Sequence, residues 1–210
     1  MGLAGDDLLA GGTDNDTLLG GLGNDTYSFE DGDGQDIIED SDGIHTLLFS
    51  DIALSDLQVV FQGEQVRVGT GLGVQGYFLS RDQWDNVQIA IGSTGAIIER
   101  SRLDTSYFDA VGNLLLTVNG TDSLTEAERD SALTVDTSDP DGPRLVVGAG
   151  ADTVEIEANA DGSATMRVIN SDAVLLVLEL TQIQLGSGLD FLQLLDGISL
   201  NLMGFSGGVV

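Results

Sequence analysis

Aspartate recurs at a fixed interval of nine residues near the start of the chain, at Asp7, Asp16 and Asp25. Glycine stands five positions before each of these residues and is frequent between them. Because glycine permits left-handed backbone and close approach, such segments form tight loops whose carbonyl oxygens turn inward. Carboxylate and carbonyl oxygens are the ligands that Ca²⁺ prefers in proteins. The spacing therefore predicts Ca²⁺ sites built from loops.

The aspartates belong to a nine-residue repeat. Its first copies read GLAGDDLLA over 2–10, GGTDNDTLL over 11–19 and GGLGNDTYS over 20–28. A fourth copy, DGDGQDIIE over 31–39, follows after two additional residues. The eighth position of the copies holds a large apolar residue, namely Leu9, Leu18, Tyr27 and Ile38. The repeat predicts a short strand after each loop, with this apolar side chain pointing into the interior.

A single copy cannot bury its apolar residue, but stacked copies can. Successive loops would then alternate between the two edges of a flattened coil, so that each loop neighbours the one 18 residues away. Oxygens from two neighbouring loops would together form a cage of the kind that Ca²⁺ occupies. The insertion of Phe29 and Glu30 breaks the nine-residue phase before the fourth copy.

The pattern resembles the glycine-rich nonapeptide GGxGxDxUx of the RTX, haemolysin-type calcium-binding repeats, and GGLGNDTYS fits every fixed position. The resemblance implies a parallel β-roll with Ca²⁺ in its turns. By position, it pairs Asp7 with Asp25 on one edge and Asp16 with Asp36 on the other. Asp14 replaces a glycine of the pattern and adds an acidic oxygen. The implied ligands, including loop carbonyls, are Gly5, Asp7, Asp14, Asp16, Gly21, Gly23, Asp25, Gly34 and Asp36.

Two other interpretations of this segment are less favoured. A flexible acidic segment would not need three copies in phase. An EF-hand beginning at Asp31 fails because its sixth position is Asp36 instead of glycine and its twelfth is Asp42 instead of glutamate.

In the remaining chain, short apolar runs separated by Gly, Asp and Ser predict short strands, so the expected fold class is all-β. We divide it into the RTX-type roll over 1–42, a β-rich cap over 43–109 and a β-rich, sandwich-like C-terminal domain over 110–210. Two later Gly-x-Gly-x-Asp patterns, with Asp152 and Asp190, are read either as degenerate repeats or as ordinary tight turns.

The charge of the chain excludes several classes of partner. The formal net charge is −28, with seven arginines and no lysine, so nucleic acid and anionic membrane surfaces are poor partners. Cysteine is absent, which excludes disulfides and thiolate metal sites. The chain shows no N-terminal signal peptide, and its apolar, acidic end from Leu176 resembles the export signals of type I secreted proteins. We therefore expect a secreted bacterial protein and the type I secretion machinery as a partner.

No catalytic constellation stands out, and we expect no enzymatic activity in this chain. GFSGG over 204–208 matches a nucleophile elbow, but no helix can follow Ser206 within the remaining residues. The one histidine, His45, lies beside an apolar run and is read as structural. A zinc hydrolase site is not credible with one histidine and no cysteine.

These observations predict a calcium-binding module that folds when it meets Ca²⁺ outside the cell. Two alternatives stay open. The chain can be the tail of a secreted protease or lipase whose catalytic domain lies elsewhere, or a calcium-dependent adhesin module that binds a glycan or another cell-surface ligand.

Overall fold

The computed structural model describes residues 1–40, 42–71, 75–108, 112, 114–121, 125, 127–128, 133–136, 144–148, 151, 153–161, 163–170, 173–180, 192–194 and 199–203. The chain forms two compact units that divide between Leu103 and Asp104. Both consist of strands joined by loops and short helical turns, so the predicted all-β fold class is confirmed. The predicted roles of 1–42 as a roll, 43–109 as its cap and 110–210 as a separate domain stay predictions.

The described residues of the first unit form ten strands and three short 3₁₀ helices. These are β1 (Leu8–Leu9), β2 (Thr17–Leu18), β3 (Thr26–Phe29), β4 (Gln35–Ile38), β5 (His45–Phe49), η1 (Leu54–Asp56), β6 (Gln58–Gln62), β7 (Gln65–Thr70), β8 (Gln75–Ser80), η2 (Arg81–Asn86), β9 (Val87–Ile91), β10 (Ala96–Ile98) and η3 (Arg100–Arg102).

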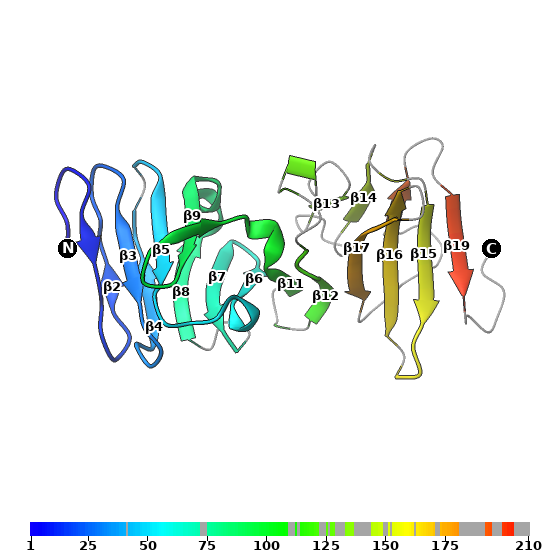
Figure 1. The fold of residues 1–210 in the computed structure, drawn as a ribbon, viewed down its shortest axis with the longest axis horizontal. Coiled ribbons are helices and arrows are strands. Elements are labelled where there is room, and N and C mark those ends of the chain that lie inside the picture. Colours follow the sequence, from blue (N-terminus) through cyan, green and yellow to red (C-terminus); the bar gives the residue numbers. More distant parts are fainter. Residues whose placement is uncertain are drawn as a thin grey trace. The chain divides into compact units, whose positions relative to one another are not determined.

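The chain alternates between two sheets in this unit. Strands β1, β3, β5 and β9 pair in parallel in one sheet, and β2, β4 and β8 pair in parallel in the other. Figure 1 shows β3, β5 and β9 side by side. Antiparallel strands extend both sheets, β10 beside β9 and the hairpin β6–β7 beside β8. The repeats therefore begin a parallel arrangement that β5, β8 and β9 continue.

The core of this unit lies between the two sheets. Side chains alternate between buried and less buried along β3 and β5, which is the period of a strand with one face inward. Tyr27, Phe29 and Phe49 of the first sheet pack on Tyr77 of the second, with ring centroids 5.4 to 6.2 Å apart. Tilted and edge-on aromatic pairs of this kind add to the free energy of apolar burial. The eighth residue of each repeat is buried as predicted, at Leu9, Leu18, Tyr27 and Ile38.

The second unit contains β11 (Asp104–Phe108), β12 (Leu114–Val118), β13 (Leu133–Asp136), β14 (Arg144–Val147), β15 (Thr153–Ala158), β16 (Ala164–Asn170), β17 (Ala173–Leu180), β18 (Leu192–Leu194) and β19 (Ser199–Met203). Six of these strands are hydrogen-bonded in the order β11-β12-β17-β16-β15-β19, and the other three form a sheet of order β13-β14-β18. Residues of both sheets, such as Leu145 and Met166, share one apolar core.

Several sequence predictions fall outside the described residues. These are the Asp152 and Asp190 positions of the later glycine patterns and the GFSGG segment over 204–208. Within the part of the chain that the structure describes, no helix is long and apolar enough to cross a membrane.

Candidate metal centre

The loops of the first unit stack in two rows. The loops before β1, β3 and β5 form what we call the first row, and those before β2 and β4 form the second row. In the first row, the Asn24 N–H donates to Asp6 Oδ1 at 2.8 Å, and the Ile44 N–H donates to Asn24 Oδ1 at 2.8 Å. In the second row, the Gln35 N–H donates to Asn15 Oδ1 at 3.0 Å. Side chains of each loop thus hold the backbone of the next.

Glycine lets these loops stack at close range. Gly23 has φ +125°, and a Cβ there would lie 2.6 Å from the carbonyl oxygen of Gly5. Gly34 has φ +96°, and a Cβ there would lie 2.2 Å from the carbonyl oxygen of Asp14. Gly21 faces a carbonyl of the first loop in the same way, at 2.4 Å. Asp14 itself is the only non-glycine residue of the described chain with positive φ, and its side chain is exposed.

The structure brings together both pairs of aspartates that the repeat predicts. The Asp7 N–H donates to Asp25 Oδ1 at 2.8 Å, and the Asp16 N–H donates to Asp36 Oδ1 at 2.9 Å. The sequence separation is 18 residues in the first pair and 20 in the second. The insertion before the fourth repeat therefore leaves the pairing on the second row unchanged.

The second oxygens of Asp25 and Asp36 lie in an unusual environment. Both side chains are fully buried, and neither Oδ2 atom has a hydrogen-bond partner among the described residues. Asp36 Oδ2 and Asp16 Oδ2 lie 2.8 and 3.0 Å from the point where a Cβ of Gly11 would stand. Burial, more than any neighbouring charge, raises the pKa of Asp25 and Asp36. A buried anion of this kind needs a proton or a cation for compensation.

A fifth copy of the repeat, which the sequence analysis missed, completes the first row. Residues 40–48 read DSDGIHTLL, and they follow the fourth copy without interruption. Gly43 takes the fourth position, where a Cβ would lie 2.0 Å from the Gly23 carbonyl oxygen. Asp40 replaces the first glycine and His45 replaces the aspartate, so both diagnostic residues are altered. The unbroken nine-residue phase and Gly43 were the signals that could have found this copy.

This copy places Asp40 and His45 beside Asp25. One ligand atom from each of the three residues lies within 4.8 Å of the others, and all three side chains are buried. His45 Nδ1 lies 3.3 Å from Asp40 Oδ2, and the Tyr27 hydroxyl donates to the same oxygen at 2.5 Å. Burial and then Asp40 raise the pKa of Tyr27, so this hydroxyl stays a donor.

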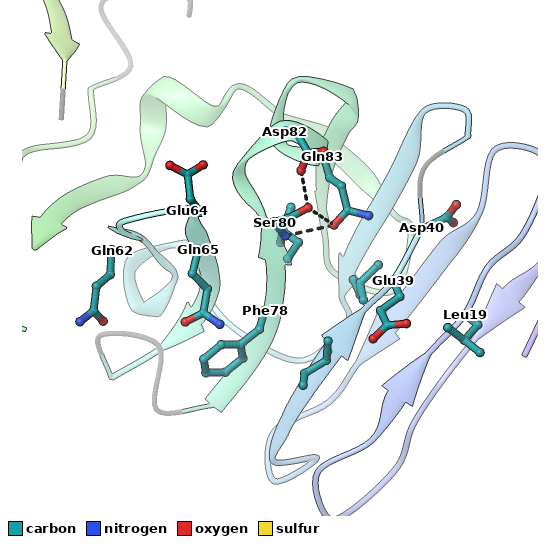
Figure 2. Close-up of a pocket in the computed structure, with 13 residues that line it drawn as sticks. Leu19, Glu39, Asp40, Gln62, Glu64, Gln65, Phe78, Ser80, Asp82 and Gln83 are labelled. Atoms are coloured by element: carbon teal, nitrogen blue, oxygen red, sulfur yellow. Dashed lines mark hydrogen bonds between the residues drawn. The ribbon is translucent and has the colours of Figure 1, made fainter. Parts of the chain in front are cut away.

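An open groove borders this cluster. It has a volume of about 750 Å³ and lies over β4, β7 and β8, and Asp40 is one of its lining residues. Figure 2 shows Glu39, Glu64 and Asp82 around it, with Phe78 between the strands. The groove is therefore acidic, although the Asp40 carboxylate itself is buried.

No protein-family model matches the chain, and no curated protein or solved structure does so. The candidate centre thus rests on the repeat and on the geometry of the loops.

Proposed function

We propose that residues 1–42 form a parallel β-roll of the RTX type whose loops bind Ca²⁺, in a secreted protein that folds on binding. The observation that supports this most directly is the pair of buried Oδ2 atoms of Asp25 and Asp36, which find no hydrogen-bond partner within the described chain. Ca²⁺ takes six to eight oxygen ligands, and carboxylates with backbone carbonyls are its usual set.

Oxygens converge at the first glycine of the early repeats. A Cβ at Gly2 would lie 2.2 Å from the Gly20 carbonyl oxygen and 2.5 Å from Asp7 Oδ2. The corresponding space at Gly11 is bordered by the Oδ2 atoms of Asp16 and Asp36. Each row thus offers carboxylate oxygens in a space that only glycine leaves open. A hard divalent cation matches these donors in charge and in type.

Ca²⁺ binding would couple to folding because the loops carry dense negative charge. Unneutralised carboxylates at about 4 Å repel by about 1 kcal/mol per pair in water and by more when desolvated. A cation that binds only the folded form shifts the equilibrium towards it. Extracellular modules bind Ca²⁺ with Kd of about 10⁻⁴ to 10⁻³ M, so cytosolic calcium would leave the loops empty. This behaviour suits export by type I secretion machinery in a loosely folded state. The hydrolase-tail and adhesin alternatives stay predictions.

The test is a Ca²⁺ titration of the chelator-treated protein, followed by far-ultraviolet circular dichroism, on wild type, Asp25→Asn and Asp56→Asn. Asp25→Asn keeps the acceptor for the Asp7 N–H and removes the charge, so we expect its Ca²⁺ midpoint to rise at least about tenfold. Asp56 is an exposed carboxylate on η1. Asp56→Asn is the control, because it removes one negative charge, as Asp25→Asn does, but outside the loops. A full β signal in chelator would reject coupled folding, and an unchanged Asp25→Asn midpoint would remove this residue from the site.

A further inference from the structure

We propose that Asp25, Asp40 and His45 form a second kind of metal site, which selects a borderline transition-metal ion such as Zn²⁺ over Ca²⁺. This goes beyond the proposed calcium function, in which the loops offer oxygen atoms alone. The two sites share Asp25, so Ca²⁺ uses its Oδ2 atom only when no Zn²⁺ is present. The three residues come from the last two loops of the first row and from the first residue of β5.

The distance between His45 and Asp40 fits a small tetrahedral ion. Zn²⁺ binds imidazole nitrogen and carboxylate oxygen at about 2.0 to 2.2 Å, which places two ligand atoms of a tetrahedron about 3.3 to 3.5 Å apart. His45 Nδ1 and Asp40 Oδ2 are 3.3 Å apart. Asp25 offers the third ligand atom of the cluster, an oxygen within 4.8 Å of the other two ligand atoms. A nitrogen donor favours Zn²⁺ and its neighbours in the first transition row, whereas Ca²⁺ prefers oxygen throughout.

Two ligand atoms of the cluster make no hydrogen bond within the described chain. These are Asp25 Oδ2 and His45 Nδ1, both buried, and His45 Nδ1 lies at ion-pair distance from Asp40 Oδ2, 3.3 Å. Gly20 lets the Oδ2 atoms of Asp25 and Asp40 and the Tyr27 hydroxyl lie close together, because a Cβ there would lie 2.2, 2.1 and 2.3 Å from these atoms. The cluster therefore gathers buried ligand atoms that lack hydrogen-bond partners.

Hydrogen bonds hold the two carboxylates in place for this role. The Tyr27 hydroxyl donates to Asp40 Oδ2 at 2.5 Å, and the Asp42 N–H donates to Asp40 Oδ1 at 3.4 Å. Asp25 Oδ1 accepts the Asp7 N–H, which leaves its Oδ2 for the ion. Outer partners of this type orient ligands and are usual around metal sites.

The composition of the chain confines such a site to this place. The sequence contains a single histidine and no cysteine, so every other acidic cluster can offer only oxygen. An ion at this position would link the loop before β3 to the loop before β5, which are the last two loops of the first row.

The single histidine also makes the test direct. Full-length ¹⁵N-labelled protein is treated with chelator, returned to saturating Ca²⁺ and titrated with Zn²⁺, while the imidazole ¹⁵N resonances are followed. We expect the Nδ1 resonance to move to its metal-bound position and the change to end at one molar equivalent, unaffected by excess Ca²⁺. An unmoved Nδ1 resonance, which a metal-free imidazole–carboxylate pair would give, overturns the proposal. Displacement of Zn²⁺ by excess Ca²⁺ or a response at Nε2 also overturns it.

Variants locate the ion. Competition with a fluorescent Zn²⁺ chelator should show at least about tenfold weaker binding in His45→Gln and Asp40→Asn. Asp16→Asn, on the second row, should bind Zn²⁺ as wild type does. Equal affinity in His45→Gln and wild type contradicts the proposal. If His45→Gln fails to fold, the wild-type resonances still decide. Loss of the Ca²⁺ folding response with a retained Nδ1 shift would reject the calcium function and leave this site standing.

Discussion

The carboxylates of Asp25 and Asp36 each have two oxygens in different surroundings. In both residues Oδ1 accepts a backbone N–H from the preceding loop of the same row. Oδ2 is buried without a hydrogen-bond partner in the described chain. This division explains why an aspartate is needed rather than a longer or neutral side chain. One oxygen joins the loops, and the other carries the charge that a cation would balance.

The metal-free protein should be more stable in mild acid than at neutral pH. Burial raises the pKa of Asp25 and Asp36 above the ordinary value of 3.8. A folded-state pKa above the unfolded one gives stability that is complete below pH 3.8 and is lost as the pH rises through the raised pKa. In chelator, the thermal midpoint of the first unit should therefore fall as the pH is raised from about 4, towards the unfolded state expected of the calcium-free protein at pH 7.

Asp36→Asn is the matched variant for this measurement. It keeps an oxygen for the Asp16 N–H and removes one titrating group, so its midpoint should change less with pH. Saturating Ca²⁺ should raise the midpoint most at neutral pH, where the carboxylates are ionised. A wild-type midpoint in chelator that rises between pH 4 and 7 would contradict the assignment.

At the scale of elements, the loops are the units that must fit together. Each loop before a strand presents carbonyl oxygens to the glycines of the next loop in its row, as at Gly23 and Gly34. The strands between them are short, two residues in β1 and β2. Their stability must come from stacking and from the buried eighth position, because an isolated pair of short strands is marginal in water.

Gly34→Ala and Gly32→Ala separate loop stacking from backbone strain. Both glycines belong to one loop and have nearly equal φ, +96° and +98°. A Cβ at Gly34 would lie 2.2 Å from the Asp14 carbonyl oxygen, whereas no described atom lies within 4 Å of one at Gly32. Gly32→Ala should cost about 1 to 2 kcal/mol through the left-handed backbone alone. Gly34→Ala should cost more, because it must displace the backbone of the neighbouring loop.

Chemical denaturation at saturating Ca²⁺ measures the free energy of unfolding of each variant. A Ca²⁺ titration of each variant then measures Ca²⁺ binding by the loops of the second row. We expect only Gly34→Ala to weaken Ca²⁺ binding. Equal losses of stability in the two variants would show that the loops do not depend on this close contact.

At the scale of the whole molecule, the two units differ in buried charge. The buried aspartates of the described chain, Asp25, Asp36 and Asp40, lie in residues 1–103, while the second unit has a core of aliphatic residues, methionine and alanine. A net charge of −28 opposes compaction in general, but buried charge is the larger local cost. Ca²⁺ should therefore act on one unit and not on the other.

Calorimetry of the full chain should show two unfolding transitions, of which only one moves with Ca²⁺. At a free Ca²⁺ concentration of about 100 times the Kd, each occupied site adds about 2.7 kcal/mol to the free energy of unfolding of the unit that holds it. High NaCl should reproduce only a small part of the shift, because screening acts weakly on buried charge. A single transition, or two that move together, would contradict independent units.

Much of the first unit follows from its sequence. The nine-residue period predicted that loops 18 residues apart are neighbours, because a regular repeat forces equivalent residues together. The resemblance to the RTX repeat implied the pairing of Asp7 with Asp25 and of Asp16 with Asp36, and the structure brings both pairs together. The apolar eighth position predicted the buried side of each short strand. The period could not predict that β8 and β9 continue the two parallel sheets, because these strands pair with β4 and β5 over long sequence separations.

The sequence by itself determined the acidic, glycine-rich loops, their rows and the all-β class, because these depend on local periodicity and residue type. Only the tertiary structure decided the surroundings of His45. In the sequence it stands beside an apolar run, whereas in the fold its Nδ1 faces Asp40 beside Asp25. The reason is physical: stacking brings residues of separate loops within a few ångströms, and a substituted repeat still stacks when its backbone keeps the phase.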